Sequence, residues 1–325
     1  MKGLRARLAQ HPAGAAAAAL VLLLALAALR QPAMLSGRVL LDVLEDGAVL
    51  GLIALGATWA ILSGGIDLSV GAVMSLASIS LAALLEQAGL GPAPAVALVL
   101  AGGLVFGAGM GACVHLLELP PFLVTLAGLF LARGLALIVH VEALAIRDPA
   151  WTRLAGLGID LGGWGRLTVA APILLAAVLA CAWALRQTRF GRDVYALGGG
   201  AELARLAGVP IARTQVGVYA TSGLLAAAAG VTYALYNGAG NSIAGVGLEL
   251  DAIAATVVGG ASLAGGVGGA FGTLLGVVFF GALQSFLIFE GRLSAGWVRV
   301  ATGALLLAFL ALQRWAVAGA REEQA

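Results

Sequence analysis

Two ionisable side chains, Arg133 and Asp67, stand within or beside long apolar segments, where a charge is most constrained in what it can do. Arg133 falls inside the apolar segment 121–141, and Asp67 lies in the glycine-rich stretch 64–71 between two apolar segments. Charged groups in such surroundings usually line a solute pathway or bind other protein groups. For Arg133 we favour a structural role, bound to a carbonyl or reaching the interface, over a pathway role. For Asp67 we favour capping of the helix that starts near Leu68 over contact with a solute.

Four further polar residues fall within residues 237–251, and their amides and carboxylates suit a polyol or a binding protein: Asn237, Asn241, Glu249 and Asp251. A solvated loop outside the membrane is the alternative interpretation. Together with Asp67 and Arg133, these four residues are the candidates for a solute pathway or its gate.

The longest polar interruption between apolar segments is residues 187–214, and most of its charged residues are arginines. A basic loop between spans is typical of the cytoplasmic side of a membrane protein. Glycines at 198–200 break the chain, residues 201–207 are predicted to form a short helix, and the Gly-Val-Pro sequence at 208–210 stops it. Such a helix is a surface for a soluble partner; an ordered loop that only carries inside charges is the alternative.

The sequence contains no motif that indicates an enzyme. The only lysine is Lys2 and no GxxxxGK[ST] motif exists, so the chain lacks the phosphate-binding loop of nucleotide hydrolases. No Ser/His/Asp grouping, HExxH or CxxC motif is present, and Cys113 and Cys181 both lie in apolar segments. We therefore expect no catalytic site, no metal site and no cofactor in this chain. Ionisable residues in the middle of apolar segments are also scarce, which argues against proton coupling and favours transport driven by a partner.

Composition places the chain in the membrane. It is 61% hydrophobic and 10% charged with a mean hydropathy of +1.03, whereas soluble domains carry about 25% charged residues. The 48 glycines fit close helix–helix packing in lipid. The net charge of +2 gives no reason to expect a nucleic-acid partner.

The fold class expected is all-α, a polytopic membrane protein with a single permease-type domain over residues 1–325. Since a helix needs roughly 20 apolar residues to cross, about ten spans are predicted. The candidate spans are 13–30, 45–63, 68–87, 93–117, 121–141, 168–186, 215–236, 250–263, 268–289 and 297–313. The weakest are 45–63, which begins with two acidic residues, and 250–263, which is short. An even count with the basic N-terminus inside puts both termini and the 187–214 loop in the cytoplasm. The first apolar run is interpreted as an uncleaved signal-anchor.

A short repeat connects two distant stretches. Residues 64–71 and 259–266 share a GGxxLxxG pattern, and both lie between apolar segments on the same predicted side. Duplicated halves are common in transporters, and matching glycine interruptions point towards the pathway. Chance similarity in a glycine-rich chain is the alternative.

Four stretches together resemble one family closely: GIDLSVGAV (65–73), PPFLVTLAGLFLARGLAL (120–137), RFGRDVYALGGGAELARLAGV (189–209) and ELDAIAATVVGGASLAGGVGGAFGTLLG (249–276). They are similar to the membrane permease subunits of bacterial ABC importers for monosaccharides, the ribose, xylose, arabinose and galactofuranose group. The resemblance covers about residues 40–315. Residues 119–139, 162–167 and 281–314 resemble the galactofuranose permeases in particular.

The resemblance implies an inner-membrane complex that imports a monosaccharide. Its other members would be a second permease, identical or homologous, cytoplasmic ABC ATPase subunits that bind the ATP, and a periplasmic sugar-binding protein. The family's coupling segment matches Gly198, Gly199, Glu202, Arg205, Leu206 and Gly208, which would contact the ATPase. The family usually has Asn where this chain has Gly200; glycine is an acceptable helix N-cap, so the change costs only about a few tenths of a kcal/mol.

Alternatives to this function are a permease for a nucleoside, an amino acid or a signalling molecule, and a stand-alone secondary carrier.

Overall fold

The computed structural model describes residues 12–289 and the isolated positions 296–297, 300, 303–304 and 307. Eight long helices make up most of it: α2 (Pro12–Arg30), α3 (Gly37–Leu62), α4 (Val70–Glu86), α5 (Pro92–Leu116), α6 (Pro121–Val139), α8 (Ala170–Gln187), α11 (Ile211–Asn237) and α13 (Ala270–Phe289). The shorter helices are η1 (Pro32–Leu35), α7 (Pro149–Ala155), η2 (Gly162–Trp164), α9 (Arg189–Gly199), α10 (Ala201–Leu206) and α12 (Leu248–Val258).

Four very short strands complete the described structure. β1 (Leu144–Ala145) pairs antiparallel with β4 (Ala239–Gly240), and β2 (Gly158–Asp160) pairs antiparallel with β3 (Arg166–Thr168). The protein is therefore an all-α membrane protein, as its composition predicts.

The long helices follow the apolar runs of the sequence. By length and composition, five of the described helices are able to cross a membrane, namely α5, α6, α8, α11 and α13, and apolar helices also form over residues 16–30 and 70–86. The predicted segment 45–63 is the second part of the 26-residue α3. The predicted segment 297–313 lies mostly outside the described residues.

The prediction of a helical span over residues 250–263 is wrong. Its helix, α12, has 11 residues, which at 1.5 Å per residue is about 16 Å, roughly half of the 30 Å hydrocarbon core. Hydropathy could not reveal this, because an apolar sequence looks the same whether its backbone is helical or not.

The bundle is built around α11, which packs against α3, α4 and α5. Glycines at every fourth position of α5 let the two backbones approach. A Cβ atom at Gly103, Gly107 or Gly111 would lie 2.5, 2.0 or 2.7 Å from an atom of α11. Buried threonines add polar contacts elsewhere: Thr58 Oγ1 of α3 lies 2.6 Å from Thr273 Oγ1 of α13.

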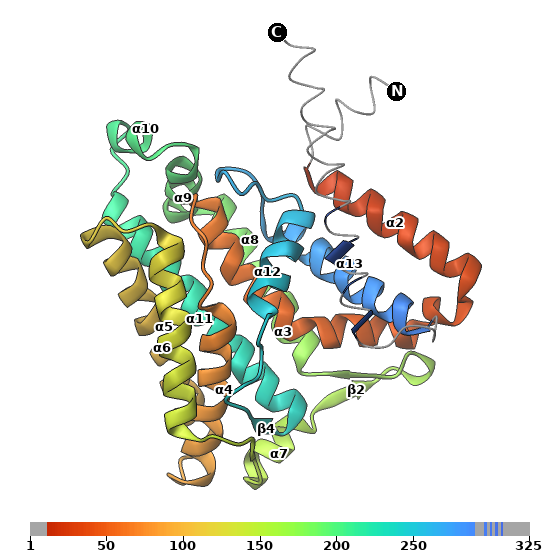
Figure 1. The fold of residues 1–325 in the computed structure, drawn as a ribbon. Coiled ribbons are helices and arrows are strands. Elements are labelled where there is room, and N and C mark those ends of the chain that lie inside the picture. The colour runs from red at the N-terminus through yellow and green to blue at the C-terminus, as the bar shows by residue number, and fades with distance from the viewer. Residues whose placement is uncertain (1–11, 290–295, 298–299, 301–302, 305–306, 308–325) are drawn as a thin grey trace, which may run out of the picture.

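The two ends of the bundle are different (Figure 1). α9 and α10 stand at one end, called here the α10 end, close to the connections that follow α3 and α12. α7 and β4 stand at the opposite end.

Candidate functional site

The α10 helix is a small, projecting element with an exposed surface. It covers Ala201–Leu206, in agreement with the predicted helix at 201–207, and it lies at the edge of the molecule in Figure 1. Leu203 and Leu206 are 71% and 84% exposed, whereas Ala204 is buried. Glu202 and Arg205 are exposed on the same short helix. A pair of exposed leucines between charged side chains is the composition of a protein-binding surface. Leu203 was not among the predicted contact residues.

A second helix, α9, precedes α10 in what the sequence suggested to be a loop. Thr188 caps it, since Thr188 Oγ1 accepts a hydrogen bond from Gly191 N at 3.0 Å. Its apolar face inserts into the bundle: Val194 and Leu197 are buried, and the Phe190 ring stacks on Trp59 of α3 with a centroid distance of 5.2 Å. The spacing of these apolar residues within a polar stretch was the signal that could have predicted this helix.

Three glycine-containing turns meet where α9 ends, and we call this contact the glycine junction: Gly64, Gly198, Gly265 and Gly266. Gly266 N donates a hydrogen bond to Leu62 O at 3.0 Å, so the turn after α12 is bound to the end of α3. Gly198 lies against both partners, because a Cβ atom there would be 1.9 Å from Leu62 O and 2.5 Å from Gly266 N. The two GGxxLxxG stretches therefore lie side by side, on the same end of the bundle.

The other glycines of the predicted coupling segment are in open space. A Cβ atom at Gly199 or at Gly208 would meet nothing within 4 Å. Gly208 has φ +81°, a left-handed conformation suited to the turn between α10 and α11. A further bond holds α9 in place, since Tyr195 Oη donates to Gly268 O at 2.8 Å.

Asp67 is buried in the connection between α3 and α4, with 2% of its surface exposed. Its Oδ1 accepts hydrogen bonds from Ser69 N at 2.9 Å and from Ser69 Oγ at 2.6 Å, directly before the first residue of α4. Its Oδ2 accepts a hydrogen bond from Ser222 Oγ of α11 at 2.7 Å. The carboxylate thus connects the start of α4 to the middle of α11, and its oxygens are occupied by protein donors.

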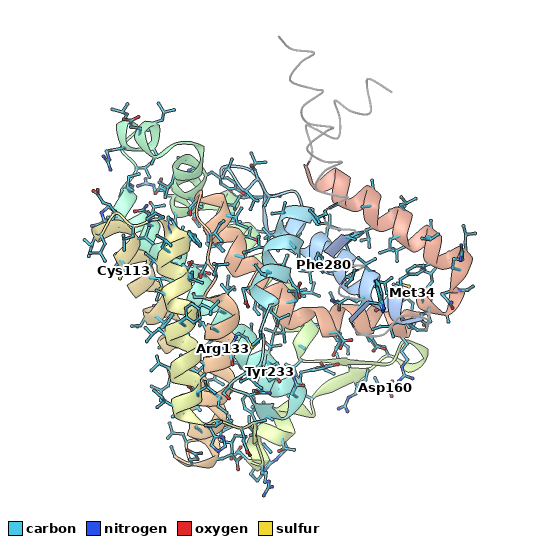
Figure 2. The ribbon with its side chains drawn as sticks, in the orientation of Figure 1. Met34, Cys113, Arg133, Asp160, Tyr233 and Phe280 are labelled. Atoms are coloured by element: carbon cyan, nitrogen blue, oxygen red, sulfur yellow. The ribbon has the colours of Figure 1, made fainter. Side chains whose placement is uncertain are left out.

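Arg133 projects from α6 between the two ends of the bundle (Figure 2). Its Nη1 donates to Ser242 O at 3.2 Å and to Ala244 O at 2.8 Å. Glu249, in the first turn of α12, accepts a hydrogen bond at its Oε1 from Gly247 N at 3.2 Å. Glu249 Oε2 is buried and has no hydrogen-bond partner among the residues that the structure describes.

The alternative interpretation of residues 237–251 as one solvated loop does not describe the whole stretch, because parts of it are helical or packed against α4. Asn237 ends α11 and donates to Tyr233 O of the same helix at 3.0 Å. Asn241 lies against α4, since Asn241 O accepts from Ser75 Oγ at 2.9 Å. Glu249 and Asp251 are in the first turn of α12. The glycines between α11 and α12 let the chain turn back against α4, which the sequence pattern alone does not show.

Known proteins with similar sequences are membrane permeases. The chain is 44% identical to the inner membrane ABC transporter permease protein YjfF of Escherichia coli K12, over 87% of this chain and 86% of that protein. It is 36% identical to the ribose import permease protein RbsC of the same strain, over 90% of this chain and 91% of that protein. It is 35% identical to the fructose import permease protein FruG of Bifidobacterium longum, over 83% of this chain and 80% of that protein.

A family model described as the permease component of the branched-chain amino acid transport system matches residues 39–310. Since this match and the relatives each cover most of the sequence, the chain belongs to this family of transport permease components.

Proposed function

We propose that this protein is the membrane-spanning permease subunit of an ATP-binding-cassette importer that moves a monosaccharide across the bacterial inner membrane. The observation that carries this proposal is α10, a projecting helix with two exposed leucines that is held against the bundle through α9. A surface of this kind suits an ATPase subunit. The names of the ribose and fructose import permeases support a sugar as the solute.

The chain acts with partners: a second permease, cytoplasmic ATPase subunits that bind the ATP, and a periplasmic sugar-binding protein. α10 and both termini are on the cytoplasmic side. When ATP brings the ATPase subunits together, they move α10, and α9 passes the movement to the ends of α3 and α12 at the glycine junction. Reversing a two-state equilibrium from 1:99 to 99:1 takes about 5.5 kcal/mol, which ATP-induced dimerisation of the partner supplies.

Selectivity resides mainly in the binding protein. Asp67 and Arg133, two charged groups beside or within the spans, are bound to protein partners. A permease with few free hydrogen-bonding groups is a low-affinity conduit for a polyhydroxylated solute. Among sugars, the narrower resemblance to galactofuranose permeases makes a furanose the first candidate.

Cross-linking tests the coupling surface. Leu206→Cys on α10 is expected to cross-link to the ATPase subunit in membranes, because Leu206 is 84% exposed. Ile159→Cys in β2, which is 64% exposed at the opposite end of the bundle, is the matched control and is expected not to cross-link. Equal cross-linking of both variants, or of neither, would contradict the assignment of α10.

Uptake of labelled solutes tests the transport function. Cells without this gene are expected to lose uptake of one monosaccharide, and removal of the ATPase gene is expected to cause the same loss. Retained uptake without the ATPase would identify a stand-alone carrier. A second candidate solute class has a specific basis, since a permease of an autoinducer-2 import system is 33% identical over 85% of this chain. Loss of a signalling molecule with unchanged monosaccharide uptake would favour that class.

A further inference from the structure

One segment of this protein crosses part of the bundle without forming a helix. After α11 ends at Asn237, residues 238–247 run along α4 before α12 begins. A Cβ atom at Gly240 would lie 2.3 Å from Ser78 O, and one at Gly245 would lie 2.5 Å from Met74 Cε and 3.2 Å from Gly71 O. We call residues 238–258, which contain this stretch and α12, the broken segment.

The non-helical part of the broken segment lies at membrane depth. Its contacts with α4 run from Ala82, near Gly240, to Gly71, near Gly245. The eleven steps from Gly71 to Ala82 along α4, at 1.5 Å each, cover about 16 Å, roughly half of the 30 Å core. The contact with Arg133, which lies well inside the span α6, places Ser242 and Ala244 at the same depth.

On the inner side of this stretch, backbone carbonyls accept hydrogen bonds from side chains of α4 and α6. Asn241 O accepts from Ser75 Oγ, and the carbonyls of Ser242 and Ala244 accept from Arg133. The hydroxyl of Ser242 donates to Val141 O at 2.7 Å. These bonds fix the course of the chain, so its other side has a defined orientation.

The other side of the broken segment is apolar and exposed within the part of the chain that the structure describes. Ile243, Val246 and Leu250 are 62%, 69% and 62% exposed. Non-helical backbone at membrane depth is tolerated only where it is buried in protein or lines a water-filled cavity, and not where it faces lipid. Arg133 and Glu249 are both only partly buried beside this stretch, and charged groups at this depth favour contact with water.

We infer that Ile243, Val246 and Leu250 line the aqueous solute pathway and form an apolar part of its wall. Such a wall offers no hydrogen-bonding or charged partner to a solute, whereas the apolar ring face of a neutral solute can lie against it. A neutral sugar or a similar polyol with such a face fits this wall. This inference deepens the proposed function and rests on it for the identity of the solute, but the access of water to these residues is independent of that function.

Cysteine accessibility tests the inference in the assembled transporter. Val246→Cys and Ile243→Cys are made in a Cys113→Ala, Cys181→Ala background and treated in membranes with a charged, membrane-impermeant thiol reagent. The control is Leu179→Cys, whose position is 60% exposed on the helical span α8. Because the thiolate is the reacting species and apolar surroundings disfavour it, both pathway variants are expected to react at least about ten times faster than the control.

The outcomes separate the alternatives. Reaction of both pathway variants only with a lipid-soluble reagent, at the rate of the control, would mean that this side faces lipid and would overturn the inference. Protection from both reagents, with a disulfide bond between two copies of the chain, would mean that a second permease covers it and would overturn it equally. Fast reaction with the charged reagent in a transporter that imports no sugar would leave the inference standing and refute the proposed function.

Discussion

The glycine junction makes a sharp prediction about Gly198. In Gly198→Ala the new Cβ would lie 1.9 Å from Leu62 O and 2.5 Å from Gly266 N. Backbone atoms must separate by about 1 Å to relieve this overlap, and overpacking of this kind costs about 1–3 kcal/mol. The hydrogen bond from Gly266 N to Leu62 O lies in the same contact, and its loss would add about 0.5–1.5 kcal/mol.

We expect Gly198→Ala to uncouple ATP hydrolysis from solute uptake without lowering the amount of the protein in the membrane. A change of about 1–3 kcal/mol in the contact through which α9 acts corresponds to about a 5- to 150-fold change in coupling. Gly198→Ala is therefore expected to reduce uptake about tenfold or more per ATP hydrolysed. Uptake and ATP hydrolysis are measured together in vesicles that contain the complete transporter.

Gly109→Ala on α5, outside the coupling segment, is the control, because a Cβ atom there meets nothing within 4 Å. It is expected to keep the ratio of uptake to hydrolysis of the unaltered protein. The reasoning is refuted if Gly198→Ala retains that ratio at normal membrane levels, or if both variants lose it to the same extent.

Two further predictions concern the stability of the bundle, measured as thermal unfolding of the purified protein in detergent. Ser222→Ala removes the donor to the buried Oδ2 of Asp67 and is expected to destabilise the protein by about 1–3 kcal/mol. Thr221→Ala removes a hydroxyl that is bonded within its own helix and is expected to have a smaller effect. Equal effects would contradict the role of the Asp67 carboxylate. Gly107→Ala places a Cβ atom 2.0 Å from a carbonyl oxygen of α11 and is expected to destabilise the α5–α11 contact by about 1–3 kcal/mol. The Cβ atom of Gly109→Ala meets nothing within 4 Å, so this variant is expected to be neutral. An unchanged melting temperature for Gly107→Ala would show that the two helices do not pack closely.

Much of the fold could be predicted from the sequence because its signals are local. Apolar runs of about 20 residues specify spanning helices wherever they occur. The short α10 helix could be predicted because glycines at 200 and 208 mark its two limits within a polar stretch. The two GGxxLxxG stretches do lie on one side, as predicted, although the count behind that prediction treated residues 250–263 as a full span.

Sequence-based predictions were wrong where the charge or the hydropathy of a segment did not reveal its backbone conformation. The charges of residues 187–214 suggested a loop, although Phe190, Val194 and Leu197 recur at helical spacing and form the buried face of α9. The apolar composition of residues 250–263 suggested a full span, although the helix there is short and follows a non-helical stretch. Hydropathy records how much apolar surface a segment has and not the path of its backbone.

The sequence by itself determined that this is a helical membrane protein, because composition and apolar segment length decide that property. It also determined the short polar helix α10, because glycines mark both of its limits. Only the tertiary structure distinguished Gly198, which lies against the turns after α3 and α12, from the adjacent Gly199, where a Cβ atom would meet nothing within 4 Å. It also brought Asp67 to Ser222 and Arg133 to the carbonyls of Ser242 and Ala244. The physical reason is that these contacts join residues far apart in the chain, and their partners are in part backbone atoms, which every residue type carries and no sequence pattern identifies.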